Sequence, residues 1–195
     1  LCNENLSYGK DKNNKVHGML IDAAWLWEEY LACVLAENTG FVHHTSDNAF
    51  QLFDKGERTF QTVIPDYLDA ENNLVADAKY IPLHRFDHLD AERAAAIYYK
   101  TIMYMYRFKA QKGFLFHPCN EGDINYYIEG GKEKSMPHSE HLTIDEYKIV
   151  DTEGYLYELG MIIPKADNYE AFCVNMRYIE AQFKNKIQEY LIPIN

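Results

Sequence analysis

Two short runs of the sequence hold the residue types that metal-assisted phosphate chemistry needs. The first is Ile64-Pro65-Asp66, and the second is Asp77-Ala78-Lys79, which begins 11 residues after Asp66. Residues two apart along a β-strand face the same side, so Asp77 and Lys79 should point together. If the two runs pair as a hairpin, Asp66 lies beside them. Two carboxylates and a lysine would then meet at one end of a sheet.

Such a patch suits Mg²⁺, a hard ion that takes oxygen ligands, keeps several waters and typically uses one or two carboxylates plus substrate phosphate. The ion lowers the pKa of a water and offsets the charge that builds on phosphate oxygens. The lysine could orient or deprotonate that water, or stabilise the leaving charge, and the sequence leaves these roles open. In the alternative interpretation, Asp66 is a turn residue after Pro65, and Asp77 and Lys79 form a solvated pair.

A helix predicted from Leu20 to about Glu37 supplies a third acid. Its apolar residues recur at helical spacing and form one stripe: Leu20, Ala24, Trp27, Leu31, Val34 and Leu35. At roughly 100° per residue, Glu28 falls at the edge of this stripe, whereas Glu29 lies nearly opposite it, in solvent. Glu28 could therefore reach inward over the sheet edge, although a boundary charge that only snorkels to water would occupy the same position.

The remaining elements follow from hydrophobic periodicity and turn signals. Strands are predicted at residues 41–44, 49–53, 59–68, 74–80, 114–117 and 154–164, and further helices at 94–110 and 169–191. An Asp/Asn-bearing connection between 59–68 and 74–80 is typical of a hairpin. Pro118 is expected to stop the strand before it, and residues 120–139 are loop-rich, with a candidate strand at 124–128. This order predicts an α/β fold with a central mixed β-sheet flanked by helices.

The helical Glu, the PD run and the DxK run together resemble the PD-(D/E)xK nuclease superfamily. The surrounding residues are more specific and resemble the McrC family, the nuclease subunit of McrBC-type modification-dependent restriction systems. The similar segments are Met19-Leu20-Ile21-Asp22 with Leu26-Trp27-Glu28-Glu29-Tyr30, Ile64-Pro65-Asp66 with Val75-Ala76-Asp77-Ala78-Lys79-Tyr80, and Tyr99 to Phe108 leading into Gly113-Phe114-Leu115-Phe116-His117-Pro118. They cover residues 19–118 in order, whereas residues 119–195 carry no motif that matches.

The resemblance implies a restriction-endonuclease-like core and a Mg²⁺-dependent DNA endonuclease in which Mn²⁺ can substitute. It implies Glu28, Asp66, Asp77 and Lys79 as catalytic residues, with the three acids as metal ligands. It also implies a McrB-like AAA+ partner that hydrolyses GTP and recognises modified cytosine in double-stranded DNA. Lys100 is an auxiliary candidate, because it stands where the family usually has Gln. A lysine there can contact phosphate but would repel Lys79 if it points inward.

The composition limits these hypotheses. The 195-residue chain carries a net charge of −11, the wrong sign for binding DNA over a broad surface unless a partner holds the DNA. The sequence has no GxxxxGK[ST] run, so nucleotide hydrolysis is assigned to another chain. No apolar run is long enough to span a membrane, and the four cysteines form no CxxC pair, which favours the cytoplasm.

Residues 1–18 are polar and predicted to be a flexible lead-in. Residues 19–195 are predicted to form a single nuclease domain, with core motifs at 19–118 and a C-terminal strand and helix extension at 119–195. Because the chain begins at Leu1, we expect a fragment of a longer protein. Two alternatives stay open: a stand-alone PD-(D/E)xK nuclease in repair or defence, and an inactive subunit that docks on and stimulates a motor. A neighbouring AAA+ GTPase gene would argue against the first, and the presence of all three acids argues against the second.

Overall fold

The computed structural model describes residues 22–81, 89–120 and 142–191, together with short strands at 5–6, 16–17, 127–129 and 132–134. Most of the lead-in predicted over residues 1–18 therefore lies outside the described residues. Within it, β1 (Asn5–Leu6) pairs antiparallel with β2 (Val16–His17). The candidate strand at 124–128 is described only from Tyr127, where β9 (Tyr127–Glu129) pairs with β10 (Lys132–Lys134).

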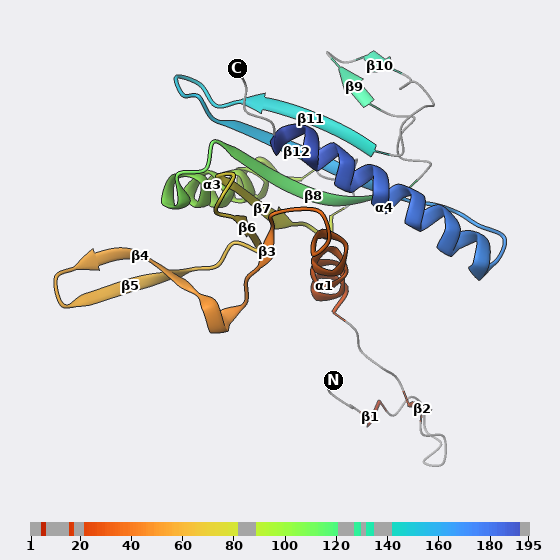
Figure 1. Ribbon diagram of the computed structural model, residues 1–195, viewed down its shortest axis with the longest axis horizontal. Helices are drawn as coiled ribbons and strands as arrows, with labels where there is room; N and C mark the ends of the chain where they lie inside the picture. Colours follow the sequence, from red (N-terminus) through yellow and green to blue (C-terminus); the bar gives the residue numbers. More distant parts are fainter. Residues whose placement is uncertain are drawn as a thin grey trace.

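A six-stranded mixed sheet organises the larger part of the described chain (Figure 1). Its strands, in spatial order, are β11 (Leu142–Lys148), β12 (Tyr155–Ile163), β8 (Lys112–Asn120), β7 (Leu74–Ala78), β6 (Tyr67–Asp69) and β3 (Val42–His43). The inner strand β8 runs parallel to both β7 and β12, whereas the other neighbours are antiparallel. After η1 (Ser46–Asn48), β4 (Phe50–Lys55) and β5 (Arg58–Val63) form a separate antiparallel hairpin. The predicted α/β class with a mixed sheet is confirmed.

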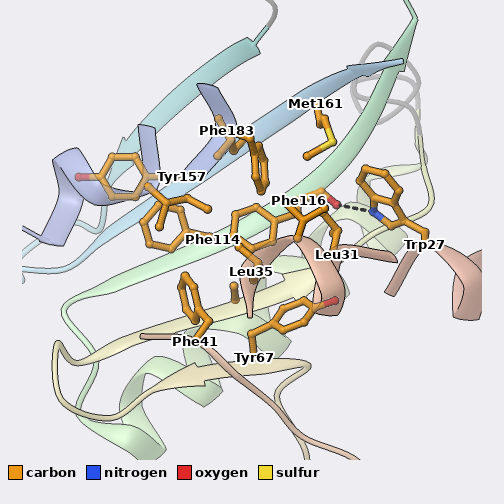
Figure 2. Packing of buried hydrophobic residues seen from close by; sticks show 14 of the residues in the cluster. Trp27, Leu31, Leu35, Phe41, Tyr67, Phe114, Phe116, Tyr157, Met161 and Phe183 are labelled. Carbon is orange, nitrogen blue, oxygen red and sulfur yellow. Dashed lines mark hydrogen bonds between the residues drawn. The ribbon is translucent and has the colours of Figure 1, made fainter. Parts of the chain in front are cut away.

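Helices cover both faces of this sheet, as predicted. On one face, α1 (Ala23–Leu35) and α4 (Tyr169–Leu191) share a core with β7, β8 and β12, and Figure 2 shows Phe114 and Phe116 of β8 inside it. On the other face, α3 (Ala91–Phe108) packs near Val75 and Leu115. Neighbouring residues of β7 and β8 thus alternate between two cores, as the two-residue strand period requires. Each fully buried phenylalanine contributes roughly 1.5–3 kcal/mol to folding.

Capping residues fix where the helices begin. Asp22 accepts hydrogen bonds at Oδ1 from the backbone N–H groups of Ala24 (2.9 Å) and Trp25 (3.2 Å), so α1 begins at Ala23 and not at Leu20 as predicted. Asp90 accepts one from Arg93 (2.9 Å), and α3 accordingly begins at Ala91 instead of residue 94. The helix predicted over residues 169–191 has those bounds in α4.

The single strand predicted over residues 59–68 was wrong. The chain leaves β5 at Val63 and enters β6 at Tyr67, so Ile64-Pro65-Asp66 separates two strands of different sheets. Proline has no N–H to donate to a ladder and fits poorly inside a strand. Its presence therefore turns the chain, and Asp66 lies at the entrance to the main sheet.

One further strand prediction needs correction, and one strand was not predicted. Pro118 does not stop β8, which continues to Asn120. Proline has no backbone N–H to donate, but β8 pairs with β7 only as far as Phe116. The missing N–H of Pro118 therefore breaks no hydrogen bond to β7. β11 was missed because its sequence, LTIDEYK, is polar and charged, as suits an edge strand. Among the helices that the structure describes, none is long and apolar enough to cross a membrane.

Candidate active site

The hairpin of β6 and β7 brings Asp66, Asp77 and Lys79 together. Asp66, just before β6, accepts a hydrogen bond at Oδ2 from the backbone N–H of Ala78, with an N–O distance of 2.7 Å. Lys79 Nζ forms an ion pair with Asp77 Oδ2. The carboxyl groups of Asp66 and Asp77 lie close enough for their charges to interact. The predicted convergence of two carboxylates and a lysine is thus present; their chemical roles stay a prediction.

Burial and two cations set the charge of this carboxyl pair. Burial by itself would raise the pKa of Asp77, which is fully buried, but the ammonium groups of Lys79 and Lys100 hold it below its usual value. At Asp66, burial and then repulsion from Asp77 and Glu28 raise the pKa to about 8, although Lys79 opposes the shift. In the metal-free protein at neutral pH, Asp77 therefore carries the negative charge and Asp66 holds a proton.

Glu28 reaches the same end of the sheet from α1. Its Oε1 lies 2.9 Å from Nε2 of His43 in β3, and its backbone carbonyl accepts a 2.5 Å hydrogen bond from the hydroxyl of Tyr67. These contacts place Glu28 beside the hairpin, where its charge helps to raise the pKa of Asp66. Glu29 was predicted to face solvent, but it is partly buried.

Lys100 enters the site from α3, on the opposite side of the sheet from α1. Its Nζ lies 3.2 Å from Asp77 Oδ1, and it also lies over the ring of Tyr104, 5.3 Å from the ring centroid. Lys100 therefore points inward, the case in which it was expected to repel Lys79. The structure places the two ammonium groups on different oxygens of one carboxylate, so attraction to Asp77 offsets their mutual repulsion.

A backbone oxygen in the neighbouring strand fixes both sides of the site. The carbonyl of Phe116 accepts a hydrogen bond from the backbone N–H of Lys79 (2.8 Å) and another from Trp27 Nε1 (3.2 Å, dashed in Figure 2). The carbonyl oxygen of Phe116 thereby holds both Trp27, which precedes Glu28, and the backbone of Lys79. This contact and the His43 contact of Glu28 were not predicted, because both depend on strand register that no local pattern encodes.

The donor set can be tested against the metal that the motifs imply. Within the described ranges no three or more His, Cys, Asp or Glu side chains form a group that could hold a metal ion. The pair Asp66 and Asp77 is what remains, and Mg²⁺ typically uses one or two carboxylates together with substrate phosphate and water. Burial and then repulsion from Asp77 raise the pKa of Asp66, and a divalent cation relieves repulsion of this kind. The pair therefore fits Mg²⁺, with Glu28 beside it.

Comparison with known proteins agrees with the motifs. The model of a family described as a McrBC 5-methylcytosine restriction system component matches residues 1–118, more than half of the 195-residue chain. The chain belongs to the McrBC family. No curated protein and no solved structure matches it. All five candidate residues lie inside the segment that matches the McrBC family: Glu28, Asp66, Asp77, Lys79 and Lys100.

The McrBC-family match ends inside β8, while the structure continues the sheet beyond it. A cavity of about 550 Å³ lies between α1, inside the match, and α4, outside it. Its lining is mostly aromatic and apolar and includes Trp27, Tyr30, Tyr80, Phe172 and Met176. It lies on the α1 and α4 side of the sheet, whereas Asp77 meets Lys100 of α3 on the other side. The cavity is therefore separate from the carboxylate site.

Proposed function

We propose that this chain is the Mg²⁺-dependent endonuclease subunit of a McrBC-type restriction system, hydrolysing DNA phosphodiester bonds on a PD-(D/E)xK core. One observation carries the proposal: Asp66, Asp77 and Lys79 meet at one buried sheet end in a chain of the McrBC family. An accidental surface pair would be solvated, whereas the Asp77 side chain is 0% exposed and that of Lys79 is 16% exposed. Burying charges costs several kcal/mol per ion, so a function is the simplest reason to keep them there.

The carboxylates of Asp66 and Asp77 would hold Mg²⁺, or Mn²⁺ in its place, with Glu28 as the acid beside them. When bound, the ion makes a water a better nucleophile and offsets negative charge on the scissile phosphate. Lys79 is fixed twice, by its ion pair with Asp77 and by the backbone bond to Phe116. A preorganised ammonium of this kind stabilises charge as it develops on a phosphate oxygen without further rearrangement.

The acidic charge of the chain supports a division of labour. At −11, the chain is poorly suited to gather a polyanion, because non-specific DNA affinity comes mainly from Lys and Arg. The sequence also has no phosphate-binding loop for a nucleotide. We therefore assign DNA recognition and GTP hydrolysis to an AAA+ partner, which presents double-stranded DNA, including DNA with modified cytosine, to this subunit.

The test is DNA cleavage in a system reconstituted with the AAA+ partner, GTP, Mg²⁺ and a duplex that carries 5-methylcytosine. Lys79→Ala should lower the cleavage rate by about 10²-fold or more, the usual loss when one preorganised donor is removed. GTP turnover and partner binding should persist, because the role of Lys79 is local. Lys165→Ala is the matched control, since Lys165 is an exposed lysine in the loop between β12 and α4.

Three outcomes discriminate the hypotheses. Cleavage by Lys79→Ala at the wild-type rate would refute the proposed site. Vigorous cutting by the wild-type chain with Mg²⁺ and no partner would favour the stand-alone nuclease. Stimulated GTP turnover without any cleavage, in the wild type as well as the variant, would favour the inactive docking subunit.

A further inference from the structure

Asp77 is shared by two lysines, one on each oxygen. Lys79 Nζ pairs with Oδ2, and Lys100 Nζ lies 3.2 Å from Oδ1. Each lysine comes from a different element: Lys79 follows β7, and Lys100 lies in the middle of α3. Both oxygens of the more acidic carboxylate of the pair are thus already engaged by cations in the metal-free protein.

The charge balance of the site shows what this means for a divalent ion. Even with Asp66 ionised, the two ammonium groups of Lys79 and Lys100 would balance the charge of both carboxylates, so these four groups exert no net attraction on Mg²⁺. Cations that bind one carboxylate compete. An ammonium within ~4–6 Å typically lowers the proton affinity of a carboxylate by about tenfold or more, and the same electrostatic repulsion acts on a metal ion. Departure of one ammonium therefore favours metal binding at Asp77.

The structure distinguishes the lysine that can leave from the one that stays. Lys79 is 16% exposed, and its backbone is tied to Phe116 in β8. Lys100 is 43% exposed, and its side chain runs over the ring of Tyr104 one helical turn further along α3. A long side chain on a helix surface can swing into water by rotamer changes, whereas moving Lys79 would disturb the end of β7.

We propose that Lys100 is a resting counter-ion of the metal site, which holds Asp77 in the metal-free protein and is displaced when a divalent cation binds. This inference rests on the proposed function and adds a regulatory device to the same site. The displaced ammonium remains tethered to α3 next to the carboxylates, where a DNA phosphate would be its new partner. Lys100 is thus a positioning residue that occupies the buried carboxylate of Asp77 until metal and substrate arrive.

The experiment is calorimetric titration of Mn²⁺ into the metal-free protein. Lys100→Gln removes the charge, and Lys100→Met also keeps the aliphatic chain that covers Tyr104. Both should bind Mn²⁺ about tenfold more tightly than the wild type, because the competing cation is gone. Arg93→Gln is the matched control, since it removes one positive charge from an exposed position of the same helix and should leave the affinity unchanged.

Asp77→Asn separates failure of this inference from failure of the proposed function. If that variant loses Mn²⁺ binding while both Lys100 variants bind as the wild type does, or more weakly, the counter-ion role is refuted and the metal site stands. If neither the wild type nor the Lys100 variants bind Mn²⁺ at millimolar concentrations, the metal site and the inference both fall. An equal gain in Arg93→Gln would also overturn the inference, because the effect would then be long-range charge alone.

Discussion

The buried imidazole of His117 should make the stability of the protein depend on pH in a way that one substitution can isolate. His117 lies in β8, is 0% exposed, and its Nδ1 lies 2.8 Å from the carbonyl oxygen of Ile81. Burial lowers the pKa of His117 to about 4, although the bond to Ile81 opposes the shift. The ring is therefore neutral in the folded protein, with Nδ1 as the donor.

The size and sign of the effect follow from linkage. In the unfolded chain a histidine has a pKa of roughly 6.5, so the unfolded state takes up a proton between about pH 6.5 and pH 4 that the folded state refuses. Stability is complete above this window and is lost as the pH falls through it. With a folded pKa of about 4, the loss from this group between pH 7 and pH 5 is about 2 kcal/mol.

Urea unfolding at pH 7 and pH 5 measures this loss. His117→Asn keeps a nitrogen donor near Ile81 but cannot be protonated, so its change in unfolding free energy should be smaller than that of the wild type by about 2 kcal/mol. The comparison matters because Asp66, with its raised pKa, acts in the opposite direction and is common to both proteins. Equal pH dependence in the two proteins would refute the argument that His117 is buried in its neutral form.

Two further predictions concern the site and its support. Asp66→Asn should stabilise the metal-free protein at pH 8 by several kcal/mol, because it removes a carboxyl whose ionisation is opposed by burial and by Asp77. It should also abolish Mn²⁺ binding. Thermal melts and calorimetry check the two expectations, and no gain in stability would contradict the electrostatics. Truncation after Asn120 should remove cooperative unfolding in circular dichroism melts, because β12 and α4 cover Phe114 and Phe116. A cooperative melt of residues 1–120 would contradict this, since it would show that the segment matching the McrBC family folds alone.

Local patterns predicted those parts of the molecule whose determinants are local. The β6–β7 hairpin follows from its turn, where Asn73 adopts a positive φ of 56° and Asp69 accepts a 3.0 Å hydrogen bond from the N–H of Asn72. The bounds of α4 follow from a long amphipathic period. With the hairpin in place, the two-residue strand period was enough to bring Asp77 and Lys79 together.

What could not be predicted depends on contacts between distant segments. The inward direction of Lys100 requires knowing that α3 crosses the sheet next to Asp77, and the helical pattern around Lys100 does not contain that information. The pairing of Glu28 with His43 requires that β3 add to the edge of β6. Pro118 was expected to end a strand because the rule is local, but the register of β7 decides whether the missing N–H matters.

The central position of β8 has a consequence for the order of events during synthesis. β7 and β8 are parallel, so they can pair only after the whole of α3 has been made and has crossed over. Until then the carbonyl of Phe116 is absent, and neither Lys79 nor Trp27 has its anchor. Pairings between distant segments form slowly, because loop-closure entropy must be overcome first. The acidic residues are thus synthesised early but are fixed in position only after β8 has emerged. β12, which pairs with the other edge of β8, emerges after that.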